Sequence, residues 1–441
     1  MVGFICKKIM DSPTPVFSAL FGFELSVLAV VAVGVSLGVC GLMVGLHRKW
    51  GWGGDSHLEE KPQRFHAHSV SRLGGVGIFV GFFATLLLVG YEDLALTGPV
   101  LICALPVFLV GVGEDITGRV RSNWRLGIAA GAALVGALWL GAVLRLPFGE
   151  SWGAAHTVLS VVFTAFCVAG VTQSFNIIDG FNGLASGVGM IVLVALGWLA
   201  LSFGDMTLCA VCWGMAASVF GFFLWNYPGG RLFLGDGGAY LLGFVIALVS
   251  VLLVARHPGV SWFLPLMLII YPVTETLFSS YRKIIMRGTG AMRADGLHFH
   301  MLVHKRLNRW GWGSHRYAAW RNSLTSTFFW VATTVTVFLG LAFWDNSFAL
   351  VCLSIGIAVA YVWFYFRIVR FRVPRWMVLA ERNQSDQMEM KFVRTISKLN
   401  GHPVNGHPVD GKIMPDRERN RADSVNRGKQ TEWWGEKTRK D

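Results

Sequence analysis

Long apolar stretches recur along about the first 370 positions of the chain, and each is close to the roughly 20 residues that a helix needs to cross a bilayer. Hydrophobic residues make up 54% of the sequence and charged residues only 15%, which is more apolar surface than one soluble core could bury. We therefore predict an all-α, polytopic integral membrane protein with about eleven transmembrane helices. The predicted spans are Phe17–Leu46, Gly74–Gly90, Pro99–Gly113, Leu126–Val143, Thr157–Ser174, Leu184–Ser202, Thr207–Trp225, Ala239–Val254, Trp262–Ser280, Thr325–Trp344 and Phe348–Phe366.

Lysine and arginine are distributed unevenly between the loops on the two sides of these spans. One side carries nearly all of them, whereas the connectors on the other side carry only Arg145 and Arg256. Because Lys and Arg collect on the cytoplasmic side of membrane proteins, the basic loops are predicted to face the cytoplasm. The net charge of +13 then reflects topology, and we expect no nucleic-acid partner. The cytoplasmic loops would be His47–Leu73, Glu114–Arg125, Phe175–Gly183, Asn226–Gly238 and Tyr281–Leu324.

The composition divides the chain into a membrane domain, residues 1–370, and a tail, residues 371–441. The tail is rich in Asn, Arg, Lys, Asp and Gly and poor in aliphatic residues, which predicts a basic, mostly disordered cytoplasmic segment. Its charge suits contact with anionic lipid headgroups.

Two glycine-flanked carboxylate groups stand at predicted cytoplasmic ends of spans. Glu114 and Asp115 follow the third span, and Asp236 opens the eighth within Gly235-Asp236-Gly237-Gly238. Such carboxylates can bind a divalent cation or accept a proton from a phosphate acceptor. The alternative interpretations are a solvated helix end for the first group and an N-cap for Asp236.

The turn between the fifth and sixth spans reads Asn176-Ile177-Ile178-Asp179-Gly180-Phe181-Asn182-Gly183. Glycines allow close approach of the backbone to a ligand, and Asn and Asp side chains can hydrogen-bond a base or ribose. The same residues also form ordinary turns, but a turn needs less polarity than this, so we favour a binding role.

The longest cytoplasmic loop contains three histidines, His298, His300 and His304, followed by Lys305 and Arg306. Together they offer concentrated donors for a diphosphate. A zinc site is the rival interpretation, although no matching Cys supports it.

Glu275 lies inside a predicted span, within Tyr271-Pro272-Val273-Thr274-Glu275. An intramembrane carboxylate is costly to bury and is therefore a functional candidate, or else it braces neighbouring helices.

Together, over about residues 45 to 320, these clusters resemble the polyprenyl-phosphate N-acetylhexosamine-1-phosphate transferase family, which is glycosyltransferase family 4 and includes undecaprenyl-phosphate GlcNAc-1-phosphate transferases. Arg72-Leu73-Gly74-Gly75 is similar to the family's first-loop signature, Asn176-x-x-Asp179-Gly180 to its nucleotide-site turn, and Gly235-Asp236-x-Gly238 to its metal-binding turn. Pro272-x-x-Glu275-Thr276 and His298-x-His300 complete the set.

The resemblance implies a Mg²⁺-dependent sugar-1-phosphate transferase in the bacterial inner membrane, with its active site facing the cytoplasm. It would transfer N-acetylhexosamine 1-phosphate from a UDP-N-acetylhexosamine such as UDP-GlcNAc to undecaprenyl phosphate. The products would be undecaprenyl-diphosphate-sugar and UMP, in the initiating step of cell-envelope polysaccharide synthesis. Its partners would be these two substrates and membrane lipids, with a homodimer also considered.

The resemblance also implies roles for individual residues. Asp236, helped by Asp115, would hold Mg²⁺, and Asp115 would orient or deprotonate the lipid phosphate. The catalytic set would be Asp115, Asp236, His298 and His300, with the two histidines at the phosphates. The substrate-binding set would be Arg72, Asn176, Asp179, Asn182, Glu275, His304, Lys305 and Arg306.

Several positions depart from the family pattern. Glu114 stands where the family usually has the first of two aspartates, and Asn182 stands where many members have a second Asp. The phospho-N-acetylmuramoyl-pentapeptide translocase remains an alternative, disfavoured because this chain lacks three consecutive histidines. A transporter of a polar or phosphorylated solute is the other alternative. A transporter should place its polar residues near the membrane midplane, whereas most of these lie at helix ends.

Overall fold

The computed structural model describes residues 15–51, 53, 70–90, 93–146, 148–286, 297–311 and 318–369, with side chains left out at 15–24, 306–311 and 318–321. Within these ranges the chain is built from helices joined by short connections, and it contains no β-strand longer than a single bridge. The all-α class is confirmed. The predicted tail, residues 371–441, and the boundary at residue 370 lie outside the described residues.

Nine helices in the described part are long and apolar enough to cross a membrane, which confirms a polytopic protein. They are α2 (Pro15–Trp50), α4 (Leu94–Thr117), α5 (Ser122–Leu140), α6 (Ala154–Ile178), α7 (Leu184–Ser202), α8 (Met206–Asn226), α9 (Gly235–Arg256), α13 (Ala318–Ala342) and α14 (Ser347–Val369). A tenth predicted span is the shorter apolar helix α3 (Gly74–Gly90).

The predicted span Trp262–Ser280 is interrupted. It forms a short helix α10 (Leu264–Leu268) and a second helix α11 (Ile270–Tyr281), with Ile269 between them in a non-helical conformation. Pro272 has no backbone N–H to donate to the carbonyl four residues earlier, which favours a break at this point. One turn of π-helix, η2 (Arg282–Met286), follows α11.

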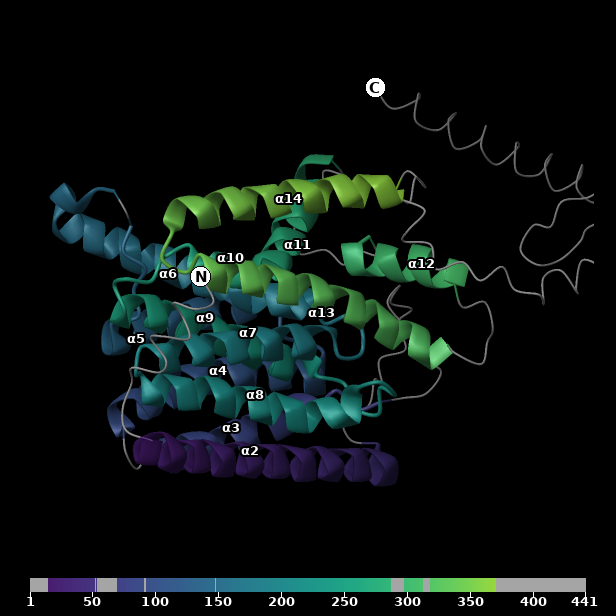
Figure 1. Cartoon of the computed structure of the whole chain (residues 1–441). Helices are drawn as coiled ribbons and strands as arrows, with labels where there is room; N and C mark the ends of the chain where they lie inside the picture. Colours follow the sequence, from purple (N-terminus) through teal and green to yellow (C-terminus); the bar gives the residue numbers. More distant parts are fainter. Residues whose placement is uncertain are drawn as a thin grey trace, which may run out of the picture. The chain divides into compact units, whose positions relative to one another are not determined.

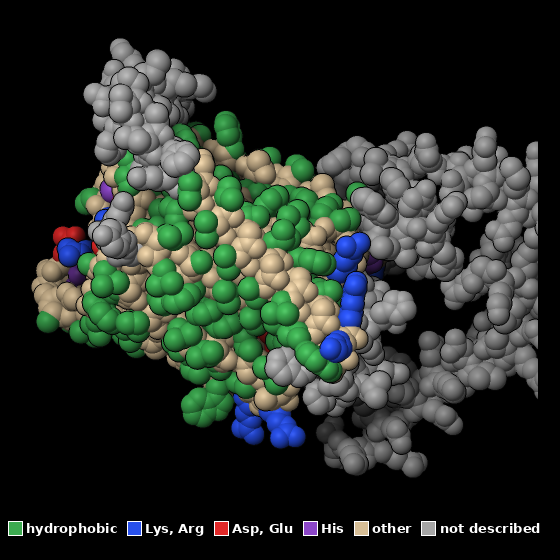
Figure 2. Space-filling view, turned by 90° about the horizontal axis from the view of Figure 1, so that it is seen from below, with side chains coloured by type: hydrophobic (Ala, Val, Ile, Leu, Met, Phe, Trp, Pro, Cys, Tyr) green, Lys and Arg blue, Asp and Glu red, His purple; other side chains and the backbone are tan. Residues whose placement is uncertain are grey.

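Helix α9 lies at the centre of the bundle, with α2 and α14 on its outside (Figure 1). In the apolar 18-residue stretch of α9, 89% of the residues are buried inside the protein. In the corresponding stretches of α2 and α14, only 22% and 17% of the residues are buried. Figure 2 shows the outer surface on one face, where hydrophobic side chains form a broad central area and Lys and Arg lie at its margins. This arrangement is typical of a bundle surrounded by lipid.

Helices α3, α4 and α9 approach one another closely near the start of α9. A Cβ atom on Gly75 would lie 2.6 Å from Cα of Gly238, and one on Gly111 would lie 2.6 Å from Cα of Gly237. Glycine therefore lets these backbones touch, as small residues do at helix contacts in membranes. The contact fixes the first turn of α9, which carries Asp236.

Two further helices complete the described part, the short 3-10 helix η1 (Glu150–Trp152) before α6, and α12 (Phe299–Gly311) before α13.

Candidate active site

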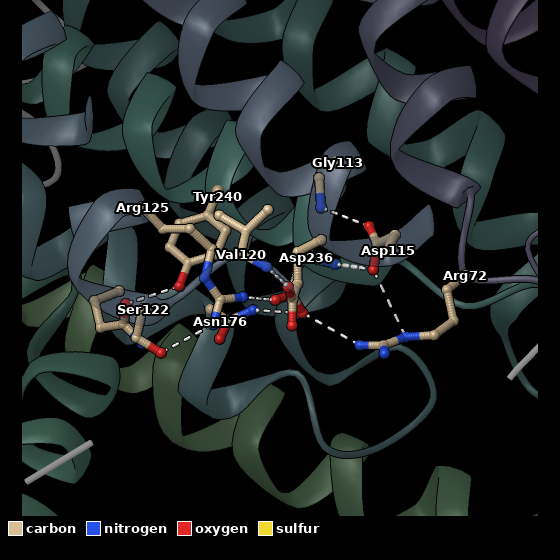
Figure 3. A network of polar contacts seen from close by, with 12 residues as sticks. Arg72, Gly113, Asp115, Val120, Ser122, Arg125, Asn176, Asp236 and Tyr240 are labelled. Carbon is tan, nitrogen blue, oxygen red and sulfur yellow. Dashed lines mark hydrogen bonds and ion pairs between the residues drawn. The ribbon is translucent and has the colours of Figure 1, made fainter. Parts of the chain in front are cut away.

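Five helix ends bring polar side chains together at one end of the bundle. Arg72 precedes α3, Asp115 is near the end of α4, Arg125 is in the first turn of α5, Asn176 is near the end of α6, and Asp236 is in the first turn of α9. Figure 3 shows Arg72 and Arg125 reaching Asp236 from opposite sides. We call these five residues the carboxylate–arginine cluster.

Asp236 is the hub of this cluster. Its Oδ1 accepts hydrogen bonds from Arg72 Nη2 at 3.2 Å and from Asn176 Nδ2 at 3.1 Å, and its Oδ2 accepts one from Nη1 of Arg125. The side chain is only 13% exposed. A carboxylate so buried is stabilised because charged and polar donors satisfy its oxygens.

Asp115 holds the N-terminus of α9. Its two carboxylate oxygens accept from the backbone N–H groups of Asp236 and Gly237, each at 2.8 Å. These amides have no partner within their own helix, and the helix dipole favours a negative charge beside them. The interpretation of Asp236 as the N-cap of its own helix is therefore wrong, because Asp115, from α4, accepts from the amides at this end.

Backbone hydrogen bonds tie the segment of Arg72 to the segment before α9. Gly74 N and Gly75 N donate to the carbonyls of Phe233 and Leu234, at 3.0 and 2.9 Å. The Arg72 side chain can therefore reach two acids at once, with its Nε 3.6 Å from Asp115 Oδ1 and its Nη2 on Asp236. It is 32% exposed, so one side of it remains open to a ligand.

The sequence analysis did not single out Arg125 or Tyr240. The Arg125 guanidinium lies 5.4 Å from the centre of the Tyr240 ring and donates to Ser122 Oγ at 2.9 Å. The Tyr240 hydroxyl in turn donates to Gln173 Oε1 at 2.8 Å. Arg125 opens an apolar span, where basic residues usually mark topology, so nothing in the sequence alone distinguished it as a partner of Asp236.

The turn after α6 places Asp179 near the same cluster. Burial raises the pKa of Asp179 to about 7, and the positive charge of Arg72 opposes that rise. The negative charge of Asp179 also acts on Asp115. A third carboxyl group thus lies within electrostatic reach of Asp115, one of the two predicted metal ligands.

Asn182 is buried in a hydrogen-bonded network behind this turn. Its side chain donates to Pro228 O at 3.1 Å, and its backbone is held by Asn322 Oδ1 and by Ser326 Oγ, at 2.9 and 2.6 Å. Only 3% of Asn182 is exposed. In this structure Asn182 joins two turns and α13, and its predicted contact with a nucleotide stays a prediction.

A second cluster forms around Glu275, which is fully buried on α11. Its Oε1 accepts from His298 Nδ1 at 2.9 Å, and both of its oxygens lie 3.2 Å from the backbone N of Phe299. The rings of His298 and His300 stack with centroids 5.3 Å apart. We call Tyr271, Glu275, His298, His300 and Tyr361 the histidine cluster.

His300 connects the histidine cluster to the turn of Asp179. Burial lowers the pKa of His300 to about 3, so the imidazole is neutral. Its Nδ1 lies 3.3 Å from the Tyr271 hydroxyl, whereas its Nε2 has no hydrogen-bond partner among the described residues. A Cβ atom on Gly180 would lie 3.0 Å from this Nε2, so the ring packs directly against the turn.

The remaining predicted donors lie on α12. His304 Nδ1 is 3.1 Å from Thr325 Oγ1, and its ring lies 4.8 Å from that of Phe181 in the turn. Lys305 is exposed, and the side chain of Arg306 lies outside the described residues. His304 therefore contacts Phe181 in the turn after α6. The predicted substrate contacts of Lys305 and Arg306 stay a prediction.

The donor set around Asp236 suits a hard cation shared with a ligand. Magnesium prefers one or two carboxylates plus phosphate oxygens and water. Among the described residues, no group of three His, Cys, Asp or Glu side chains could hold a metal ion unaided. The residues thus fit a Mg²⁺ held by Asp236 and a neighbouring carboxylate against a phosphorylated ligand. They do not support the rival zinc site at the histidines.

Comparison with known proteins shows which families and relatives the chain is similar to. Residues 98–254 match the family model described as glycosyl transferase family 4. Over this stretch, which is less than half of its length, the chain is similar to this family. The matched residues run from α4 to α9 and include Asp115, Asn176, Asp179 and Asp236 of the candidate site.

Individual proteins to which the chain is similar carry two kinds of name. The chain is 27% identical over 264 residues to a probable undecaprenyl-phosphate N-acetylglucosaminyl 1-phosphate transferase of Bacillus subtilis, covering 58% of this chain and 70% of the relative. It is 25% identical to an undecaprenyl-phosphate alpha-N-acetylglucosaminyl 1-phosphate transferase of Thermotoga maritima, covering 56% and 72%. It is 29% identical to a phospho-N-acetylmuramoyl-pentapeptide-transferase of Moorella thermoacetica, covering 49% and 62%.

Proposed function

We propose that this chain transfers N-acetylhexosamine 1-phosphate from a UDP-sugar to undecaprenyl phosphate. An oxygen of the lipid phosphate attacks the phosphorus that bears the sugar. The bond from that phosphorus to the bridging oxygen breaks, and UMP leaves with that oxygen. The product is undecaprenyl-diphosphate-sugar.

One observation carries the proposal, which is the convergence of Arg72, Arg125, Asp115 and Asp236 from four separate helix ends. Phosphoryl transfer needs little covalent chemistry from a protein, because fixed positive charge and a cation can stabilise the transition state. Two arginines beside two carboxylates provide that combination, and Arg gives bidentate hydrogen bonds to phosphate.

The residues around this centre have distinct tasks in the proposal. Arg72 and Arg125 orient the diphosphate, and Asn176 and Asp179 lie at the nucleotide. Asp115 keeps the N-terminus of α9 in place and orients the acceptor phosphate. His298 and His300 approach the phosphates from the other side of the Asp179–Gly180 turn and stabilise charge as UMP leaves.

We infer that Mg²⁺ is the metal, held by Asp236 with Asp115 or Asp179. When bound, the ion would neutralise charge on the diphosphate as the bond to UMP breaks. Asp236 is suited to this because it lies at the N-terminus of a helix whose own position is fixed by Asp115.

The location of the cluster also argues against the transporter alternative. Asp115, Asn176 and Asp236 all lie within two turns of a helix terminus, whereas a transporter binds its solute near the midplane, at interrupted helices. The proposed enzyme is accordingly a multi-pass protein of the inner membrane whose site faces the cytoplasm.

The proposal is tested by measuring UMP release from membranes that contain the protein. The donors are UDP-GlcNAc, other UDP-N-acetylhexosamines and UDP-N-acetylmuramoyl-pentapeptide, each with undecaprenyl phosphate and Mg²⁺. We expect release from a UDP-N-acetylhexosamine that requires both the acceptor and the metal. Release from the pentapeptide donor alone would assign the translocase reaction, and no release from folded protein with any donor would refute the transferase.

A further inference from the structure

Helix α14 reaches the histidine cluster through two tyrosines. Tyr361 and Tyr365 lie one helical turn apart on the same face of α14, and both are buried. Helix α14 begins at Ser347, whereas the stretch that matches the family model ends at residue 254, more than 90 residues earlier. Its contacts with the site are therefore a property of this chain that the family match does not cover.

Tyr361 completes the binding of a buried carboxylate. Its hydroxyl donates to Glu275 Oε2 at 2.8 Å, while Oε1 accepts from His298. Glu275 is fully buried, so each donor matters, because a buried charge without hydrogen bonds is strongly unfavourable. Among the described residues, removing the Tyr361 hydroxyl would leave Glu275 with only His298 and the amide of Phe299 as direct donors.

Tyr365 contacts the chain after Glu275 and the chain just before His298. Its hydroxyl accepts from Arg282 Nη1 at 2.7 Å and donates to the carbonyl of Leu297 at 3.2 Å. Arg282 directly follows α11, and Leu297 directly precedes His298. One side chain of α14 thus contacts the end of the Glu275 helix and the start of the histidine segment.

Aromatic packing reinforces the same contact. The ring of Phe299, between the two histidines, lies 4.9 Å from that of Tyr361. The ring of Phe278 on α11 lies 4.7 Å from that of Tyr365 in an edge-to-face arrangement. Such pairs contribute beyond the area they bury, and here they hold α11, α12 and α14 in one geometry.

We propose that Tyr361 and Tyr365 of α14 are positioning residues, which set the orientation of His298 and His300 through Glu275 and Leu297. The proposal rests on the proposed function, in which the two histidines face the phosphates. His300 depends on this support because it packs on Gly180 and its Nδ1 reaches only the Tyr271 hydroxyl at hydrogen-bonding distance among the described side chains. A small rotation of the histidine segment would move its ring away from the turn.

The decisive variant is Tyr361→Phe, assayed by UMP release in the same membranes as the unmodified protein. Loss of one hydrogen bond to a buried charged group should lower kcat about tenfold. The KM for the UDP-sugar should change less than about twofold, because the histidines act on charge that develops in the transition state. Tyr365→Phe should act in the same direction. Tyr281→Phe is the matched control, because Tyr281 is 50% exposed at the end of α11. The kcat of this control variant should not change.

A double-mutant cycle distinguishes positioning from a general loss of stability. In a His298→Ala background, Tyr361→Phe should lower kcat by a clearly smaller factor than in the unmodified protein, because one of the two histidines through which it acts is gone. If instead the two substitutions lower kcat by independent factors, Tyr361 acts through stability alone and the positioning role is overturned.

Labelling of histidines with diethyl pyrocarbonate gives a readout that does not depend on activity. In Tyr361→Phe, modification of His298 should rise severalfold, whereas modification of His156 should not. His156 is the internal control because it is similarly buried and bonds the carbonyl of Leu146. Unchanged kcat together with unchanged His298 labelling overturns the proposal. If the unmodified protein releases no UMP, the proposed function fails, and the labelling alone decides whether α14 holds the histidines.

Discussion

Asp236 is the residue on which the candidate site depends most, because its two oxygens accept from three side chains of three different helix ends. We predict that Asp236→Asn lowers UMP release at least about a hundredfold, as expected for loss of an electrostatic group that acts on the transition state. The amide would remove the negative charge for the metal and place an NH₂ group against an arginine. The measurement is the rate per amount of protein recovered in folded form.

The matched control for this variant is Asp205→Asn. Asp205 is also buried and also paired with an arginine, since its Oδ2 accepts from Arg256 Nε at 2.8 Å. It differs in its position, because it caps the N-terminus of α8, away from the candidate site. Activity of this variant should stay within about twofold, while stability falls by about 1 kcal/mol through loss of the charged pair with Arg256, because the Asn side-chain oxygen can still cap the helix. An equal loss of activity in both variants would mean that any buried aspartate is needed, and would remove Asp236 from its role.

The adjacent acids Glu114 and Asp115 are predicted to differ sharply in importance. Glu114 accepts one hydrogen bond, from Val120 N at 2.7 Å, which the amide oxygen of Gln can also accept. Asp115 accepts hydrogen bonds from two backbone N–H groups at the start of α9, one on each carboxylate oxygen. An asparagine at this position has only one oxygen, so its NH₂ group would face one of these N–H donors. Glu114→Gln should retain activity within a few-fold, and Asp115→Asn should lose at least about a hundredfold.

Both variants should be compared by UMP release and by thermal unfolding in detergent. Equal losses of activity in the two would contradict the assignment of Asp115 alone to the N-terminus of α9.

At the level of residues, the sequence predicted the acids better than their partners. Asp115, Asp236 and Asn176 stood out because polar residues beside glycines at span ends are unusual. Arg125 and Tyr361 did not, because an arginine at the start of an apolar span and a tyrosine inside one are ordinary features of membrane helices. Their role follows from long-range contacts, which hydropathy and spacing do not contain.

At the level of elements, the long apolar stretches located helices well and interruptions poorly. The predicted span Leu184–Ser202 has the same ends as α7. The predicted span Trp262–Ser280 is two helices, because hydropathy averages over the prolines that break the hydrogen-bond ladder. That break ends α10 at Leu268, so the helix that the prediction missed is α11, which carries Tyr271 and Glu275 of the histidine cluster.

The glycine contacts between α3, α4 and α9 lead to a prediction about these elements. Gly75→Ala should lower the stability of the protein by about 1 to 3 kcal/mol, because the added methyl group would force the backbones of α3 and α9 apart. Gly131→Ala on α5 is the control, since its added Cβ meets no atom within 4 Å and alanine favours a helix.

Thermal unfolding in detergent measures both glycine variants. A Gly75→Ala protein as stable as the Gly131→Ala protein would show that α3 can move away from α9 without cost.

At the level of the whole molecule, the uneven distribution of basic loops predicts which end faces which compartment. All residues of the carboxylate–arginine cluster belong to the basic side, and the connector with η1 belongs to the other. In a protein without its native cysteines, Arg119→Cys should react with a membrane-impermeant maleimide only after cells are opened. Glu150→Cys should react in intact cells.

Both positions are exposed, so access to solvent alone does not separate them. The reverse labelling pattern would place the site outside the cytoplasm and would remove UDP-sugars as donors.

The central helix α9 has a consequence for how this chain can change over time. Any residue that replaces a glycine has at least one side-chain carbon atom. At Gly75, Gly111 and Gly238, close to Asp236, that carbon would meet the backbone of another helix. Lineages that carry this gene can therefore exchange the lipid-facing residues of α2 or α14 one at a time, whereas no single mutation at those three glycines is silent for packing. A compound that lies against these three glycines would therefore contact a surface that substitution cannot change without disturbing the packing of α9.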